Sequence, residues 1–192
     1  MAQALLTDRL AALKPAPAVL SAGMLGDGKP ACPEAITVMA GRGLDIAPHR
    51  SRRVTAEDLE AADLTLAMAR ENLRYAVVTA PAVWPRAFTL RELVRRGSTV
   101  GPRAAGEDLA GWLARAHDGR ERGALLGDSA ADDVADPAGG PPGGFAETAA
   151  ILSELLDRLV GLCWQTSDAA AGGRGPHERQ GRAWPQGSER GA

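Results

Sequence analysis

Short apolar runs alternate along most of this 192-residue chain with segments whose apolar residues recur at helical spacing. The runs at 18–23, 63–68 and 87–90 have the length and flanking residues of buried strands. Helical patterns or helix-start signals occupy 1–13, 33–41, a short stretch after Thr55, 70–80, 90–96, 107–117 and 151–162. This alternation predicts an α/β fold, a small doubly wound parallel sheet with flanking helices, whose ligands bind beyond the carboxyl ends of the strands.

The start of the chain departs from the usual order of such a domain. A doubly wound domain normally opens with a strand, and the loop after that strand meets a helix N-terminus and binds phosphate there. This chain begins inside the helical segment, where Leu5, Leu6 and Leu10 form an apolar face and Pro15 ends the pattern. We therefore expect the first strand of the sheet to be missing from the chain as given.

Chain length indicates one domain with an appendage. We place the domain at 1–165, because the apolar periodicity of the last helical segment ends near Leu162. The remainder, 166–192, is Ala, Gly, Arg, Gln and Pro without periodicity and is interpreted as a disordered tail. Trp184 is the one residue of this tail that could dock, and a solvated Trp is the simpler interpretation.

Composition excludes several classes of protein. With 24 acidic and 22 basic side chains and 4% aromatic residues, the chain is neither a broadly basic nor an aromatic-rich nucleic-acid binder. No run approaches the roughly 20 apolar residues of a membrane span. Asp8 and Arg9 stand where a signal peptide would need an unbroken apolar stretch. Two cysteines cannot build a disulfide framework. We expect a cytoplasmic protein that binds neither nucleic acid nor membrane.

Several short segments, in order and with consistent spacing, resemble the low-molecular-weight protein-tyrosine-phosphatases. They are MAQALL at 1–6, LSAG at 20–23, GKP at 28–30, GLD at 43–45, HRSR at 49–52, ADL at 62–64, FTLREL at 88–93 and DP at 136–137. The resemblance covers about residues 1–163. It implies a small four-stranded parallel sheet flanked by helices, and hydrolysis of phosphotyrosine through a cysteinyl-phosphate intermediate.

The chemistry of that family needs a cysteine and an arginine six positions later in one loop. The thiolate attacks phosphorus, while the loop amides and the guanidinium hold the phosphate oxygens. Cys32 is followed six residues on by Val38, and Cys163 by Ala169, so this chain contains neither the nucleophile nor the phosphate-binding arginine of the motif. In relatives the loop lies immediately before the segment that matches 1–6, and the missing strand and turn amount to about 10–20 residues.

Two explanations remain open for the missing loop. Met1 is either an internal methionine, with the protein extending upstream, or the start of a truncated and inactive relative. We favour the first, because the rest of the core pattern is intact and a gap in the sheet would expose a strand edge that invites aggregation. The chain as written is expected to be inactive.

Asp136, directly before Pro137, is the candidate catalytic residue. In the family the aspartate of this pair protonates the leaving phenolate and then helps to deprotonate the water that cleaves the intermediate. A phenol has a pKa near 10, so its departure at neutral pH benefits from a positioned acid. Asp132 and Asp133 lie nearby and are interpreted as solvated loop charges, because neither precedes the proline.

Ser21 and His49 match family positions that hold the phosphate loop in shape, and we expect them to support it here. Without the resemblance, Ser21 is a hydroxyl at the end of a strand and His49 a surface loop histidine. The arginines at 50, 52 and 53 are interpreted as a solvated link that could draw acidic substrates toward the site.

Two departures from the family bear on the substrate. Ala138 and Gly139 stand where relatives carry aromatic residues, and the loop at 24–28 also lacks one. These absences predict a shallow, permissive rim. The expected partner is a phosphotyrosine protein or a small aryl phosphate, and we expect no cofactor and no metal.

Two other functions are alternatives to the phosphatase. A non-catalytic binding or regulatory module would keep the scaffold without the nucleophile loop. A thiol-based arsenate reductase would need resolving cysteines around that loop, whereas Cys32 and Cys163 are interpreted as ordinary buried cysteines.

Overall fold

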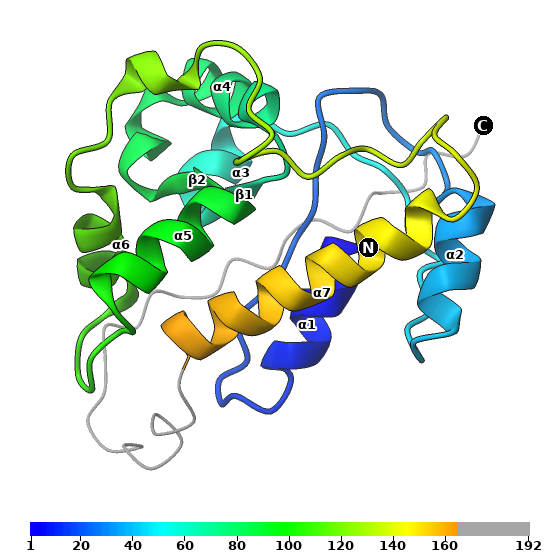
Figure 1. Ribbon diagram of the computed structural model, residues 1–192, viewed down its shortest axis with the longest axis horizontal. Coiled ribbons are helices and arrows are strands. Elements are labelled where there is room, and N and C mark those ends of the chain that lie inside the picture. The colour runs from blue at the N-terminus through cyan, green and yellow to red at the C-terminus, as the bar shows by residue number, and fades with distance from the viewer. Residues whose placement is uncertain (165–192) are drawn as a thin grey trace, which may run out of the picture.

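The computed structural model describes residues 1–164, as a chain of helices interrupted by two short strands (Figure 1). The elements in order are α1 Ala2–Leu10, α2 Pro33–Ala40, α3 Ala56–Ala61, β1 Thr65–Ala67, α4 Arg70–Thr79, the 3₁₀ helix η1 Pro81–Arg86, β2 Ala87–Thr89, α5 Leu90–Val100, α6 Leu109–His117, the 3₁₀ helix η2 Arg122–Leu125 and α7 Gly144–Cys163. Within these residues no helix is both long and apolar enough to cross a membrane. The predicted tail, with Trp184, lies outside the described residues.

The sheet of the described chain consists of β1 and β2, which run parallel with Thr65 opposite Ala87 and Ala67 opposite Thr89. The crossover between them passes through α4 and η1, as parallel pairing requires. All three residues of β2 are buried, whereas Thr65 and Leu66 in β1 are only half-buried. The predicted α/β class and these two strands are confirmed.

The predicted strand at 18–23 is wrong for this chain. The segment is extended, and its one strand-like contact is a parallel bridge between Gly23 and Arg53. Gly23 donates to the carbonyl of Arg52 at 2.9 Å, and the amide of Val54 donates to the carbonyl of Gly23 at 2.9 Å. Leu20 remains 51% exposed. Strand geometry needs a neighbouring strand whose backbone satisfies alternate backbone groups, and residues 18–22 make no backbone–backbone hydrogen bond to another described segment.

Helix ends follow local signals where those signals are strong. The predicted helix start after Thr55 is confirmed and forms a capping box: Thr55 Oγ1 accepts from the amide of Asp58, and the Asp58 carboxylate accepts from the amide of Thr55. Helix α5 continues beyond the predicted residue 96 to Val100. Helix α7 begins seven residues before the predicted start, after Gly143, whose φ of +88° favours glycine.

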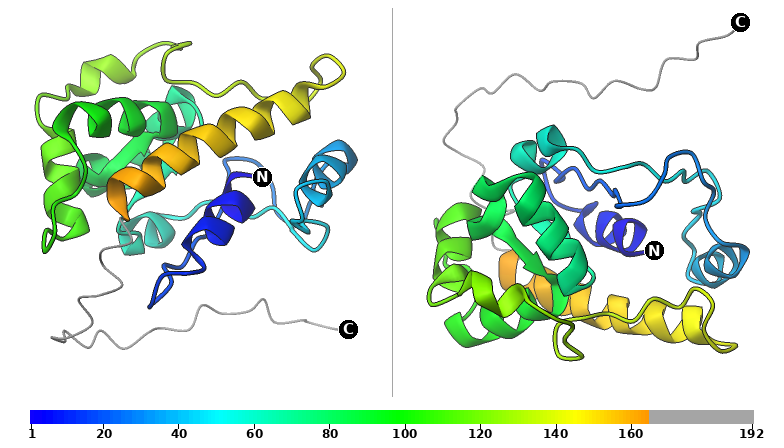
Figure 2. Two further views of the ribbon diagram at one scale, coloured as in Figure 1. Left: turned by 60° about the horizontal axis from the view of Figure 1, so that its bottom comes forward. Right: turned by 90° about the horizontal axis from the view of Figure 1, so that it is seen from above.

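Two apolar clusters hold the elements together. The larger one joins α1, α2, α5, α6 and α7, and its fully buried members include Leu10, Met39, Trp112 and Leu159. The smaller one lies among α3, α4, η1 and both strands. Helix α7 runs along α1, α2 and α5, so this one helix ties the first and middle parts of the chain together (Figure 2).

Candidate active site

The first turn of α1 organises one group of predicted site residues. Ser21 Oγ donates to Gln3 Oε1 at 2.6 Å, and Gln3 Nε2 donates to the carbonyl of Val19 at 3.0 Å. The extended segment 19–21 is therefore fastened to the start of α1. The amides of the first turn have no partner within the helix, because the first intrahelical bond is that from the amide of Leu5 to the carbonyl of Met1.

His49 is exposed in the link between α2 and α3. Its amide donates to the carbonyl of Ile46 at 3.1 Å in a turn. The pKa of His49 is lowered by partial desolvation of the ring and then by the positive charges of the Met1 ammonium and Arg50. Desolvation also lowers the pKa of the Met1 ammonium. Of these two residues, Ser21 is thus bonded to the first turn of α1 through Gln3, whereas His49 makes no hydrogen bond to α1 among the described residues.

Asp136 lies in the loop between η2 and α7, with an exposed side chain. Its Oδ1 accepts from the amide of Ala138 at 2.9 Å, which closes a tight turn around Pro137. Gly139, with a φ of +74°, follows this turn. Among residues 1–164, no hydrogen bond joins Ser21, His49 and Asp136 to one another, so each of the three predicted site residues has its own local partners.

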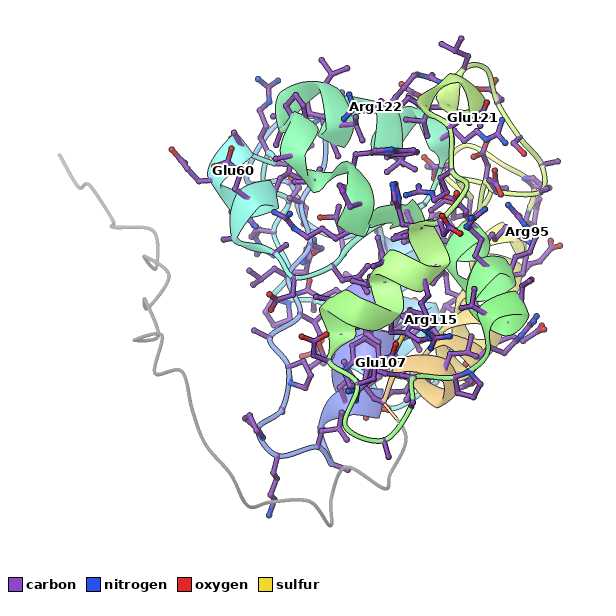
Figure 3. All side chains as sticks on the ribbon, turned by 90° about the vertical axis from the view of Figure 1, so that its left-hand side faces the viewer. Glu60, Arg95, Glu107, Arg115, Glu121 and Arg122 are labelled. Carbon is purple, nitrogen blue, oxygen red and sulfur yellow. The ribbon has the colours of Figure 1, made fainter. Side chains whose placement is uncertain are left out.

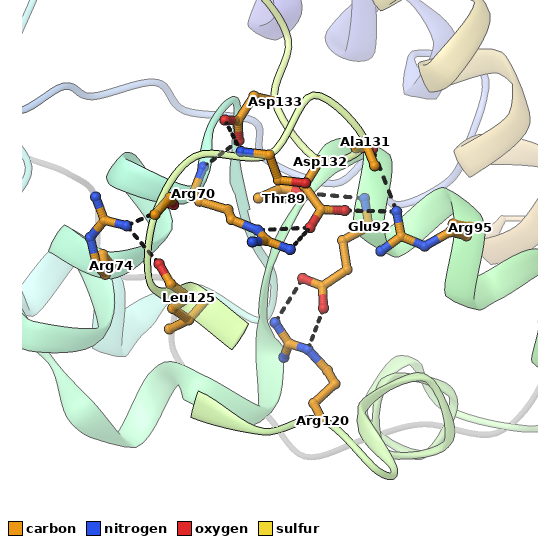
Figure 4. Close-up of polar contacts among 12 residues, drawn as sticks. Arg70, Arg74, Thr89, Glu92, Arg95, Arg120, Leu125, Ala131, Asp132 and Asp133 are labelled. Atoms are coloured by element: carbon orange, nitrogen blue, oxygen red, sulfur yellow. Dashed lines mark hydrogen bonds and ion pairs between the residues drawn. The ribbon is translucent and has the colours of Figure 1, made fainter. Parts of the chain in front are cut away.

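The expectation that Asp132 and Asp133 are solvated is wrong. Asp132 is 4% exposed and lies between the guanidinium groups of Arg70 and Arg95 (Figure 4). Burial alone would raise the pKa of this carboxyl, but hydrogen bonds and charges from Arg95 and Arg70 outweigh it and lower the pKa. Asp133 is half-buried and accepts from the backbone amides of Arg70 and Ser129. Neither ion pair has a local sequence signal, because Asp132 is 62 residues from Arg70 and 37 from Arg95.

A cavity of about 280 Å³ adjoins these arginines. Glu92 and Arg120 form a bidentate ion pair in the wall of this cavity. Arg120 Nε donates to Glu92 Oε1 at 2.8 Å, and Arg120 Nη2 donates to Glu92 Oε2 at 2.9 Å. The Arg120 guanidinium lies 3.9 Å from the ring centroids of both Trp84 and Phe88. Desolvation lowers the pKa of Arg120, opposed by the Glu92 carboxylate. The charges of this cavity are therefore largely matched within the protein.

Figure 3 shows charged side chains at several places on one side of the molecule. Arg95 and Glu121, which line the cavity, lie on one part of this face, and Glu107 and Arg115 lie together on another. The second pair is an ion pair of 2.9 Å between α6 and the loop before it. Within the part of the chain that is described, no group of three His, Cys, Asp or Glu residues is arranged to hold a metal ion.

The two cysteines occupy opposite environments. Cys163 is buried at the end of α7, and burial raises the pKa of its thiol to about 12. Cys32 is exposed and its Sγ donates to Glu34 Oε2 at 2.6 Å, so the expectation that it is buried is wrong. Pro33 starts α2 immediately afterwards, which leaves Cys32 at the N-cap, on the surface.

Solved structures define the class of this fold. A low molecular weight protein tyrosine phosphatase from T. tengcongensis superposes with a TM-score of 0.60 and 30% identity, covering 83% of this chain and 87% of that one. The YwlE arginine phosphatase from Geobacillus stearothermophilus superposes with a TM-score of 0.60 and 25% identity, and the match covers 91% of this chain and 89% of that one. Wzb from Vibrio vulnificus, solved with benzylphosphonate, shares the fold at 19% identity and a TM-score of 0.58, covering 83% and 86%. The fold is that of an α/β phosphatase.

Sequence comparisons give the family. The model of the low molecular weight phosphotyrosine protein phosphatase family matches residues 1–99. EpsP of Ralstonia solanacearum, described as a probable low molecular weight protein-tyrosine-phosphatase, is 38% identical over 94 residues, which are 48% of this chain and 62% of that protein. The EpsP of Ralstonia nicotianae is 45% identical over 69 residues, which are 35% of this chain and 45% of that protein. This chain belongs to the low molecular weight phosphotyrosine protein phosphatase family.

The matched regions have a limit that bears on the site. The chain spans less than two thirds of the length of these curated relatives. The family match includes Ser21 and His49 and ends before Asp136. The assignment of Asp136 therefore depends on its Asp-Pro pair and on its loop.

Proposed function

We propose that the complete protein is a phosphoric monoester hydrolase of the protein-tyrosine-phosphatase type, acting on a phosphotyrosine protein or a small aryl phosphate. The observation that carries the proposal is the start of α1, where Ser21 is hydrogen-bonded to Gln3 beside a helix end with unpaired amides. Such a helix end attracts an anion through its amides and its dipole. We place the nucleophilic cysteine and the phosphate-binding arginine on a segment that precedes Met1.

The reaction proceeds in two steps. The cysteine thiolate forms a bond to phosphorus as the bond from phosphorus to the phenolic oxygen breaks, and Asp136 gives its proton to that oxygen. Water then attacks phosphorus, Asp136 takes a proton from it, and the thiolate and inorganic phosphate are released. Ser21, held by Gln3, and His49 keep the loop amides aimed at the phosphate.

The rim of this site is shallow and permissive in our proposal. Ala138 and Gly139 follow Pro137 and offer no ring to grip a phenol. A shallow rim accepts different leaving groups, and the likeness to an arginine phosphatase makes phosphoarginine a useful comparison substrate.

A second candidate function is a non-catalytic binding or regulatory module. It is favoured by one observation: within the 192 residues no arginine stands six positions after a cysteine. The reading frame upstream of Met1 separates the two candidates. Codons for a strand followed by C-x5-R support the enzyme, and an in-frame stop directly upstream supports the module.

The test is expression of the chain with its upstream in-frame codons. The extended protein is expected to hydrolyse p-nitrophenyl phosphate. Asp136→Asn is expected to slow the hydrolysis of phenyl phosphate by about 100-fold and that of the activated nitrophenyl ester much less, because only the poor leaving group needs the acid. Equal slowing of both esters contradicts the acid role. Hydrolysis of phosphoarginine in preference to either ester contradicts the proposed substrate class.

A further inference from the structure

We propose that Asp132, clasped between Arg70 and Arg95, is a positioning residue that fixes the loop carrying Asp136 onto the carboxyl end of β1. The effect of this residue on catalysis rests on the proposed function. The clasp itself rests on the geometry alone.

Both carboxylate oxygens of Asp132 are used in the clasp (Figure 4). Oδ2 accepts from Arg70 Nε at 2.9 Å and lies 2.7 Å from Arg70 Nη2, while Oδ1 accepts from Arg95 Nη1 at 2.7 Å. The Asp132 side chain is 6% exposed, against 23% for Arg70 and 53% for Arg95. A carboxylate buried to this degree is stable only with such partners, so its position is strongly determined.

The next residues extend the attachment to the strand and to α4. Asp133 Oδ1 accepts from the amide of Arg70, the first residue of α4, at 2.7 Å. A carboxylate at that position satisfies a free helix amide and meets the positive end of the helix dipole. The amide of Val134 donates to the carbonyl of Met68, directly after β1, at 2.7 Å. Three consecutive residues are thus tied to the place where β1 ends and α4 begins.

Asp136 follows this anchored segment after a single residue. The carbonyl of Ala135 accepts from Thr148 Oγ1 of α7 at 3.5 Å, and beyond Asp136 the loop contains Gly139 and Gly143 in conformations with positive φ. The anchored side of the loop is therefore the N-terminal one. An acid that must meet a leaving oxygen loses much of its effect when it is displaced by about 1 Å, so the clasp contributes to the rate through the position of Asp136.

A purely structural ion pair would also lower stability when broken, so the test needs a readout of loop position. In the 192-residue chain, we compare Asp132→Asn with Asp128→Asn, a matched control at an exposed carboxylate four residues earlier in the same loop. The amide of Val134 is expected to exchange hydrogen about 10-fold faster in Asp132→Asn and unchanged in Asp128→Asn. Equal exchange in the two variants would overturn the clasp.

Arg95→Gln is the second variant, because Arg95 is half exposed and its replacement leaves the buried Arg70–Asp132 pair in place. In the extended, active protein it is expected to lower kcat for phenyl phosphate about 10-fold more than kcat for p-nitrophenyl phosphate, with KM unchanged. Arg95→Lys restores a positive charge and is expected to recover part of the loss. Slowing both esters by the same factor would overturn the positioning role.

The two proposals fail in different ways. An extended chain that cleaves neither ester contradicts the proposed function and, with it, the catalytic consequence of the clasp. The exchange of Val134 in the 192-residue chain still decides whether Asp132 holds the loop, because that measurement needs no catalysis.

Discussion

Two apolar runs of the same length, 18–23 and 63–68, adopt different structures in this molecule. The second supplies β1, which pairs with β2 along three residues. The first is extended but makes a single bridge at Gly23, and Leu20 is 51% exposed while Leu66 is half-buried. The difference shows that an apolar run becomes a strand only where a neighbouring strand is present to satisfy its backbone.

The same contrast extends to the flanking parts of the chain. Between α1 and α3, α2 is the one helix, and its buried residues are Ala35 and Met39. From α3 to the end of α7, the described residues contain both strands and most of the buried side chains. The segment between α1 and α3 thus contributes few side chains to the apolar core.

The largest expected effect concerns the two thiols, one in each part. At pH 8 a thiol with a pKa of about 12 is ionised in only about one molecule in 10⁴. Iodoacetamide is expected to label the exposed Cys32 at least about 100-fold faster than the buried Cys163, as followed by mass spectrometry of the native protein. Unfolding in urea should remove the difference. Rapid labelling of Cys163 under native conditions would show that the end of α7 opens readily.

The next prediction compares Phe88→Ala in β2 with Leu20→Ala. Phe88 is fully buried beneath the Arg120 guanidinium, so its truncation is expected to lower the free energy of unfolding by about 3–5 kcal/mol. Leu20→Ala is expected to cost less than about 0.5 kcal/mol, because half of that side chain already contacts water. Urea titrations of both variants measure the difference.

Addition of the upstream segment sharpens this comparison. If a strand from that segment pairs with 18–23, Leu20→Ala should cost about 2 kcal/mol or more in the extended protein. An unchanged cost would contradict the proposed strand.

A smaller effect is expected from Asp132→Asn, and it depends on pH. The pKa of Asp132 is lowered in the folded protein, so its charge stabilises the fold above the unfolded pKa near 4, and this contribution is lost as pH falls below that value. The variant is expected to lose about 2 kcal/mol of unfolding free energy at pH 7 and clearly less at pH 3. Asp128→Asn is the control at both pH values. A loss of equal size at the two pH values would indicate a defect of packing.

The smallest effect belongs to the capping box of α3. Thr55→Ala removes one acceptor for a helix amide and is expected to cost about 1 kcal/mol, measured by thermal unfolding. Thr55→Ser keeps the hydroxyl and serves as the control. A loss as large as that of Phe88→Ala would mean that α3 supports the smaller apolar cluster more than its length suggests.

The candidate site could be predicted from the sequence only in part. Ser21, His49 and Asp136 were identified through short family segments, and the structure bonds Ser21 to Gln3 in the first turn of α1. Their roles, like that of Asp136, remain predictions. The clasp of Asp132 was missed, because a carboxylate in a Gly- and Asp-rich loop has the pattern of a solvated turn, and its partners lie on two distant helices.

By itself the sequence determined the features that depend on neighbours within a few residues: the period of α4 and α7, the capping box at Thr55, and the apolar character of β1 and β2. Tertiary structure alone decided whether 18–23 paired, which cysteine was buried, and that Asp132 would lie between two arginines. Helix periods and caps arise from bonds between residues three or four apart, whereas strand pairing and the burial of a charge depend on which distant segment supplies the partner.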